Sequence, residues 1–115
     1  MRYKVLVIDD EEMIRTMLSK CLDAEGFLVY AAESAKKALE LMSVTPDIIL
    51  LDINMPEMDG LELCQFIRKH ISCPIVFLTA RVTEQDLING LSVGGDDYIT
   101  KPFEIKEVVA RVAVQ

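Results

Sequence analysis

Five polar residues follow short apolar runs, and their side chains suit one kind of chemistry. They are Asp9, Asp10, Asp52, Thr79 and Lys101, and the runs before them start at residues 5, 48, 75 and 98. The carboxyl ends of parallel strands lie along one edge of an α/β sheet, where ligands bind, so we expect these side chains to meet in one pocket. Three carboxylates, a hydroxyl and an ammonium group predict a site for a divalent cation and a phosphoryl group.

The three carboxylates carry most of this pattern. Asp9 and Asp10 are adjacent, and adjacent carboxylates at a strand end repel each other unless a cation such as Mg²⁺ compensates. Either of them could instead cap a helix that starts at Glu11 or Glu12. Asp52 ends a buried apolar strand, where a carboxylate is rarely placed for stability. It could act as a nucleophile toward phosphorus, or it could be an unpaired or helix-capping aspartate.

Thr79 and Lys101 are weaker signals when each is taken alone. The Thr79 hydroxyl could hydrogen-bond a phosphoryl oxygen, although threonine is also common in strands and caps. Lys101 could pair with the same phosphoryl group, or it could be a solvated surface lysine. Pro102 follows Lys101, so the peptide bond between them could be cis. The prediction rests on the joint placement of all five residues at strand ends.

The elements that would position these residues alternate along the chain. Strands are expected at 3–8, 27–31, 47–51, 74–78 and 97–100, and helices at 12–24, 34–43, 60–69, 83–93 and 104–114. We expect Gly26 to end the first helix, Ser34 and Asp59 to cap the second and third, and Met13 and Leu39 to face the core. Five βα units joined by right-handed crossovers predict a parallel sheet with helices on both faces.

Composition limits the classes that remain. The 115 residues fit one domain, and 51% apolar residues supply a core. The net charge of −7 argues against nucleic-acid binding by this chain itself. No apolar run approaches the roughly 18 residues of a membrane span, and we see no signal peptide, so we expect a cytoplasmic protein without a membrane partner. Cys21, Cys64 and Cys73 are expected to be reduced thiols.

Together the motifs resemble the receiver domain of two-component response regulators. The segments that carry the resemblance are Val7-Ile-Asp-Asp-Glu-Glu12, Leu51-Asp-Ile-Asn-Met-Pro56, Met58-Asp-Gly60, Leu78-Thr-Ala80 and Asp96-Asp-Tyr-Ile-Thr-Lys-Pro-Phe103. They cover essentially the whole chain in order. The resemblance implies a flavodoxin-like (βα)5 fold with strand order 2-1-3-4-5. It also implies a signalling domain, rather than an enzyme, that accepts a phosphoryl group from a sensor histidine kinase.

The resemblance implies a role for each residue of the predicted pocket. Asp52 would be the phosphoacceptor. Asp10 and Asp52 would ligate Mg²⁺ directly, Asp9 would help through water, and the backbone carbonyl of Asn54 would be a further ligand. Lys101 would neutralise the phosphoryl oxygens.

A second group of residues would pass the signal on. By the same resemblance, Thr79 would move toward the phosphoryl group and Tyr98 would rotate inward behind it. The output surface would comprise 83–93, 97–100 and 104–114.

The C-terminal part is similar to receivers of the winged-helix (OmpR/PhoB-like) transcription-factor class, which dimerise through the output face by cross-subunit ion pairs. Asp97 and Arg111 match one such pair, and Glu107 matches an acidic partner. Leu87 stands where the basic partner of Glu107 would be, so the network is only partly present. We expect a homodimer on activation, and the alternative for Asp97 and Arg111 is an ordinary surface pair.

Three functions compete. The leading one is the receiver of a DNA-binding regulator, and because the last helix reaches Gln115 without a cap, we expect an effector domain to follow and to make the DNA contacts. The second is a stand-alone receiver that acts by protein contact. The third, a Mg²⁺-dependent phosphohydrolase, is disfavoured because Asn54 stands where a second acid would be needed. That amide could instead orient a water molecule and speed self-dephosphorylation.

Overall fold

A single parallel sheet forms the centre of the molecule. The computed structural model describes residues 2–55, 59–80, 88, 89, 92 and 94–114. Within these ranges the strands are β1 (Lys4–Ile8), β2 (Leu28–Ala32), β3 (Ile48–Asp52), β4 (Ile75–Thr79) and β5 (Asp97–Thr100). All four strand pairs are parallel, and the order is β2-β1-β3-β4-β5. The predicted flavodoxin-like order is therefore confirmed.

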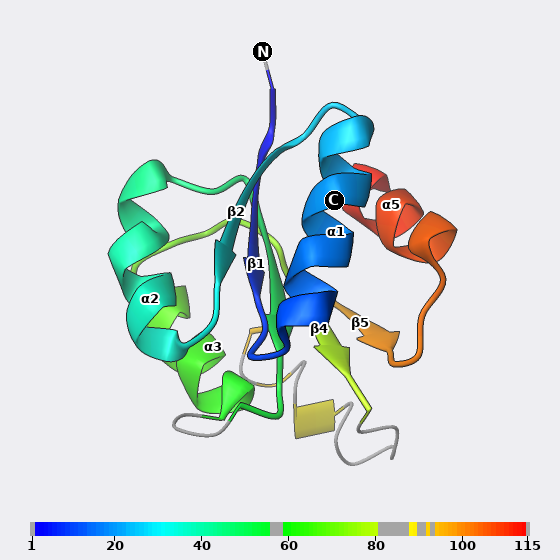
Figure 1. Ribbon diagram of the computed structural model, residues 1–115. Coiled ribbons are helices and arrows are strands. Elements are labelled where there is room, and N and C mark those ends of the chain that lie inside the picture. The colour runs from blue at the N-terminus through cyan, green and yellow to red at the C-terminus, as the bar shows by residue number, and fades with distance from the viewer. Residues whose placement is uncertain (1, 56–58, 81–87, 90–91, 93, 115) are drawn as a thin grey trace.

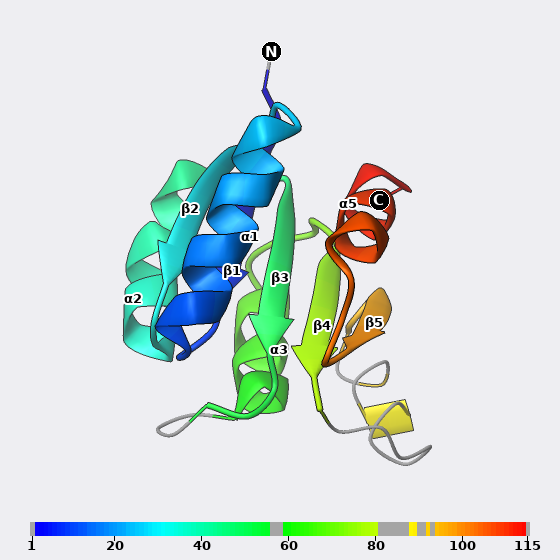
Figure 2. The ribbon, with the colours of Figure 1, turned by 45° about the vertical axis from the view of Figure 1, so that its right-hand side comes forward.

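Helices cover both faces of this sheet (Figures 1 and 2). They are α1 (Glu12–Ala24), α2 (Ala35–Glu40) with the short 3-10 helix η1 (Leu41–Val44), α3 (Gly60–Arg68) and α5 (Ile105–Val114). Helices α1 and α5 pack on one face, and α2 and α3 pack on the other. The helix predicted at 83–93 lies mostly outside the described residues, so that prediction stays open.

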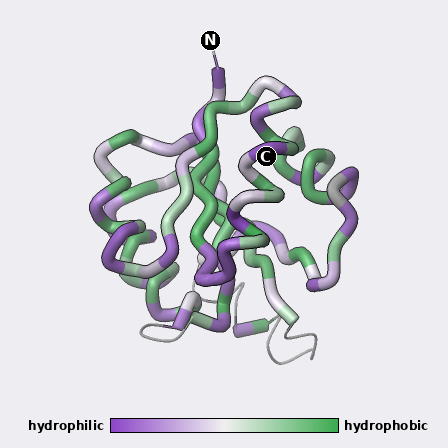
Figure 3. The backbone as a smooth tube through the Cα atoms, viewed as in Figure 1, coloured by the Kyte–Doolittle hydropathy of each residue, from purple (hydrophilic) through white to green (hydrophobic). Residues whose placement is uncertain are grey.

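The two cores arise from the alternation of side chains along the strands. In β3, Ile49 and Leu51 face α2 and α3, whereas Ile48 and Leu50 face α1 and α5. Every residue of β3 and β4 is buried, because each strand is covered on both faces and flanked on both edges. Figure 3 shows the result as a hydrophobic centre with hydrophilic segments around it. A charged side chain at the end of such a strand is therefore unusual and needs polar partners.

Strand register brings the carboxyl ends to one edge. Asp52 is paired with Leu78, and Thr79 with Thr100. Beyond the last ladder positions, the Asp9 amide donates to the Ala32 carbonyl at 3.1 Å, and the Lys101 amide donates to the Thr79 carbonyl at 2.7 Å. The backbone thus fixes the positions from which the predicted site residues extend.

Arg68, near the end of α3, ties the segment before β5 to the rest of the fold. Its guanidinium donates to the carbonyls of Cys73 (2.6 Å) and Gly94 (2.6 and 3.1 Å) and pairs with Asp96 at 2.8 Å. The Asp96 carboxylate also accepts a hydrogen bond from the Ile75 amide at 2.8 Å. One side chain therefore helps to set where β5 begins beside β4.

The helix ends follow local chemistry. Ser34 caps α2 by accepting from the Lys37 amide at 3.1 Å, and the Asp59 carboxylate caps α3 by accepting from the Leu61 amide at 2.7 Å. Gly26 follows α1 with φ of +94°, a conformation that suits glycine. These three predictions are confirmed. The last part of the second predicted helix, however, forms the 3-10 helix η1 and not an α-helix.

Two side chains expected in the core are exposed. Met13 is 84% exposed and Leu39 is 38% exposed. The buried line of α1 runs through Leu18 and Leu22, and Met13, five residues before Leu18, lies about 140° around the helix from it. Leu39 likewise lies one residue, about 100°, past the buried Ala38. The prediction that both side chains face the core was wrong, because it followed their hydrophobic type and not their exact position around the helix.

Candidate functional site

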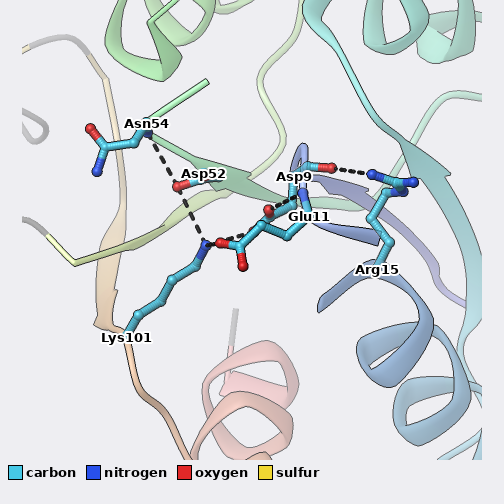
Figure 4. Close-up of polar contacts among 6 residues, drawn as sticks. All are labelled: Asp9, Glu11, Arg15, Asp52, Asn54 and Lys101. Carbon is cyan, nitrogen blue, oxygen red and sulfur yellow. Dashed lines mark hydrogen bonds and ion pairs between the residues drawn. The ribbon is translucent and has the colours of Figure 1, made fainter. Parts of the chain in front are cut away.

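Asp9 is the hub of the site at the sheet edge. It is fully buried just after β1, and its two carboxylate oxygens have different partners (Figure 4). Oδ1 accepts from the Glu11 amide at 2.9 Å, and Oδ2 accepts from Lys101 Nζ at 2.8 Å. Arg15 Nη1 donates to the Asp9 carbonyl at 2.9 Å. Asp9 therefore accepts a hydrogen bond in the turn before α1, as the capping alternative expects, and pairs with Lys101 as well.

Asp52 presents the second buried carboxylate. Its side chain is 3% exposed, its Oδ1 lies 3.6 Å from Lys101 Nζ, and the Asn54 amide donates to the same oxygen at 3.2 Å. Burial, together with the negative charge of Asp9, raises the pKa of Asp52 from 3.8 to about 7, although Lys101 and the Asn54 amide work in the opposite direction. The local surroundings thus supply too little positive charge for this carboxylate.

Lys101 reaches into the site and is not a solvated surface lysine. Its side chain is 15% exposed, and Nζ also lies 3.3 Å from Glu11 Oε1. Burial, the largest single influence, acts to lower the pKa of Lys101, but the contacts with Asp9, Asp52 and Glu11 together raise it. The raised pKa keeps the ammonium group charged beside the carboxylates.

The peptide bond between Lys101 and Pro102 is cis, as the sequence allowed.

The three aspartates lie close enough to share a cation. Asp9, Asp10 and Asp52 each place one carboxylate oxygen within 4.8 Å of the others. Two oxygens bound to one Mg²⁺ lie no more than about 4.2 Å apart, because each bond is about 2.1 Å long. The cluster is therefore close to the size of a Mg²⁺ coordination shell, and direct ligation would bring these oxygens closer together. Asp10 is exposed while Asp9 and Asp52 are buried, so the cluster opens toward solvent at Asp10.

A close backbone approach fixes the segment after Asp52. The Gly60 amide donates to the Ile53 carbonyl at 2.8 Å. A Cβ atom on Gly60 would lie 2.2 Å from the Asp52 carbonyl oxygen and 2.7 Å from Ile53 Cα. Only glycine therefore fits between α3 and the end of β3. The sequence contained this glycine within a recognised segment, but it did not reveal the contact.

Thr79 and Tyr98, the two predicted switch residues, lie on the neighbouring strands β4 and β5. Thr79 is buried, and it lies two residues beyond Phe77 on the same strand face. The rings of Phe77 and Tyr98 pack with centroids 6.3 Å apart at 59°. Tyr98 is half-buried in β5. The ring of Tyr98 therefore packs on the side chain that lies two residues before Thr79 in β4.

Asp97, Glu107 and Arg111 lie together on the face formed by β5 and α5. Arg111 Nη1 lies 2.8 Å from both carboxylate oxygens of Asp97, and Arg111 Nε lies 3.8 Å from Glu107 Oε1. The pair raises the pKa of Arg111. Leu87 lies outside the described residues. Arg111, which was predicted to pair across a subunit interface, therefore pairs with Asp97 and Glu107 of its own chain.

Glu11 and Arg15 are site residues that sequence reasoning missed. From the sequence, Glu11 is only a possible helix start within a recognised motif, and Arg15 is only part of a helix. Both reach the site by side-chain length, Glu11 to Lys101 and Arg15 to the Asp9 carbonyl. Only the run of four acids at 9–12 signalled that the turn after the first strand is unusually charged.

None of the helices in the described parts of the chain has the length and apolar character that crossing a membrane requires.

The amino-acid sequence is similar to those of known proteins. The family profile described as "Response regulator receiver domain" matches residues 5–113. The chain is 46% identical to the uncharacterized transcriptional regulatory protein YrkP of Bacillus subtilis (strain 168), over all of this chain and 50% of YrkP. It is 43% identical to the nisin biosynthesis regulatory protein NisR of Lactococcus lactis subsp. lactis, over 97% of this chain and 49% of NisR. The chain thus spans about half the length of these relatives.

The fold is also similar to that of a solved structure. The chemotaxis protein CheY4 of Vibrio cholerae superposes with a TM-score of 0.94 and 30% sequence identity, over 99% of this chain and 98% of CheY4. Sequence family, strand order and overall superposition lead to one assignment: the chain belongs to the family of response regulator receiver domains.

Proposed function

We propose that this chain receives a phosphoryl group on Asp52 from a sensor histidine kinase and passes the signal to a DNA-binding effector. One observation carries the proposal: a buried carboxylate at the sheet edge lies 3.6 Å from a partly buried ammonium and within 4.8 Å of two further carboxylates. Phosphoryl transfer mainly needs positioning and charge compensation, and this arrangement supplies both. Relatives named as transcriptional regulatory proteins support the kind of output.

In the proposed reaction a carboxylate oxygen of Asp52 attacks phosphorus. A new P–O bond forms, the P–N bond of the phosphohistidine breaks, and the electron pair of that bond returns to the imidazole nitrogen. Lys101 lies within reach of the transferred phosphoryl oxygens and would compensate their charge. Because the pKa of Asp52 is about 7 in this environment, added positive charge would favour the reactive carboxylate form.

The donor set fits Mg²⁺. Carboxylate and carbonyl oxygens are its preferred protein ligands, and here they would come from Asp10, Asp52 and the backbone carbonyl of Asn54, with Asp9 beside them. When bound, the ion would neutralise the carboxylates and the phosphoryl oxygens. Asp9 is held by Lys101 and by the Glu11 amide, so its role would be to orient the ion's surroundings through water.

The switch would run from Thr79 to the output face. Thr79 would turn toward the phosphoryl group. Tyr98, whose ring packs on Phe77 of the neighbouring strand β4, would move inward behind it. The output face includes Asp97, Glu107 and Arg111. Because Arg111 already pairs with Asp97 in one chain, a homodimer would form by exchanging these partners across the subunits.

A second candidate is a stand-alone receiver that acts by protein contact. The similarity to the chemotaxis protein CheY4, a chain that extends little beyond the shared fold, is the observation behind it. The encoded full-length sequence separates the two readings. Either receiver would meet its kinase in the cytoplasm.

Intact mass spectrometry after incubation with acetyl phosphate tests the proposal. We expect wild type to gain one phosphoryl mass with Mg²⁺ and none when the metal is chelated. Asp52→Ala should gain none in either condition, and size-exclusion chromatography of the modified wild type should show dimer. Equal mass gain in wild type and Asp52→Ala would contradict the proposal.

A further inference from the structure

Three carboxylates share the ammonium group of Lys101, and they differ in exposure. Nζ lies 2.8 Å from Asp9, 3.3 Å from Glu11 and 3.6 Å from Asp52. Figure 4 shows the contacts of Nζ with these carboxylates. Asp9 and Asp52 are buried, whereas the Glu11 side chain is 59% exposed. An ammonium group has three N–H donors, so Asp9 and Glu11 already occupy two of them.

A phosphoryl group arriving at Asp52 would need a donor from Lys101. Asp9 cannot give one up easily, because its buried carboxylate would lose its charged partner. Glu11 can turn to water, because an exposed ion pair contributes little. Glu11 is therefore the partner of Lys101 that can be released.

On the basis of the proposed function, we infer that Glu11 is a positioning residue that competes with the incoming phosphoryl group for Lys101. It holds the ammonium toward the mouth of the site in the resting protein and slows phosphoryl uptake. Sequence assigns Glu11 no such role, because the contact spans 90 residues and depends on side-chain reach.

Rates of phosphorylation by acetyl phosphate with Mg²⁺ test the competition. Glu11→Gln should raise the second-order rate constant about two- to fivefold at low ionic strength, the range expected for one exposed ion pair. The gain should shrink as salt is added, because exposed charges are screened. A purely structural role for Glu11 would give no such dependence on salt.

Two further variants separate the contact from general charge. Glu11→Asp keeps the charge but is one methylene too short for the contact, so it should behave like Glu11→Gln. Glu12→Gln removes an equal charge one residue away, and this side chain lines a groove with Met13 and Lys20 instead, so its rate should match wild type. If Glu11→Asp behaves like wild type, or if Glu12→Gln matches Glu11→Gln, the inference is overturned.

The Lys101 ammonium provides a readout that needs neither metal nor phosphoryl group. In ¹⁵N NMR spectra of metal-free protein, both Glu11 variants should shift or broaden the Lys101 Nζ signal, and Glu12→Gln should not. An unchanged signal would overturn the inference. Wild type that takes up no phosphoryl group would overturn the proposed function, whereas active wild type with unchanged rates in the Glu11 variants would overturn this inference alone.

Discussion

Replacing Asp52 by asparagine should stabilise the metal-free protein at neutral and alkaline pH. The wild-type carboxylate is buried beside Asp9, and Lys101 at 3.6 Å compensates it only in part. Ionising Asp52 therefore costs more in the folded protein than in the unfolded chain. Asparagine keeps a similar shape without that charge, so the folded variant avoids the cost.

The size of the effect follows from the pKa. Folding raises the pKa of Asp52 from 3.8 to about 7, which corresponds to on the order of 4 kcal/mol. Because the folded pKa is the higher one, this carboxyl group contributes its full stability below about pH 4 and loses it as the pH rises to about 7. The variant lacks this loss. The difference between variant and wild type should therefore grow across that window and then level off.

Urea unfolding followed by far-UV circular dichroism, in a chelator and from pH 4.5 to 8.5, measures this difference. All other ionisable groups occur in both proteins, so their contributions largely cancel. Glu12→Gln is the control for removal of one negative charge at an exposed position, and its difference from wild type should stay nearly constant. Added Mg²⁺ should narrow the gap, because the ion would stabilise wild type. A gap that does not change with pH would refute the reasoning.

Two further outcomes follow from the same region. Gly60→Ala should cost on the order of 3 kcal/mol in the free energy of unfolding, because the new Cβ would lie 2.2 Å from a backbone oxygen at the end of β3. Gly26→Ala, with φ of +94° and no atom within 4 Å of the new Cβ, should cost only about 1 kcal/mol, and equal losses would contradict the steric argument. Asn54→Met should lengthen the lifetime of the phosphorylated protein, since an apolar side chain cannot orient a water molecule. An unchanged half-life, measured by intact mass over time, would count against that role.

Much of the fold could be predicted because apolar runs and helical periods are local signals. The five strands were placed to within one residue at each end. Their ends differ because inter-strand hydrogen bonds, rather than residue type, decide where a strand stops: Asp52 and Thr79 belong to β3 and β4 through their pairing with β4 and β5. The convergence of the site followed from topology, since parallel strands share one carboxyl edge.

The remainder depends on three-dimensional contacts that spacing does not encode. Glu11 contacts Lys101, which lies 90 residues further along the sequence. The need for glycine at position 60 comes from the approach of α3 to β3. The pairing of Asp97 with Arg111 inside one chain depends on how α5 lies beside β5. These are tertiary distances, and residue type indicates them only weakly.

Chemical identification of the phosphorylated residue tests the central claim most directly. Wild type treated with acetyl phosphate and Mg²⁺ would be reduced with borohydride, which converts an aspartyl phosphate to homoserine, and then digested for tandem mass spectrometry. We predict homoserine at position 52, and aspartate there when either the donor or the metal is omitted. Homoserine at position 9 or 10, with aspartate kept at position 52, would contradict the account.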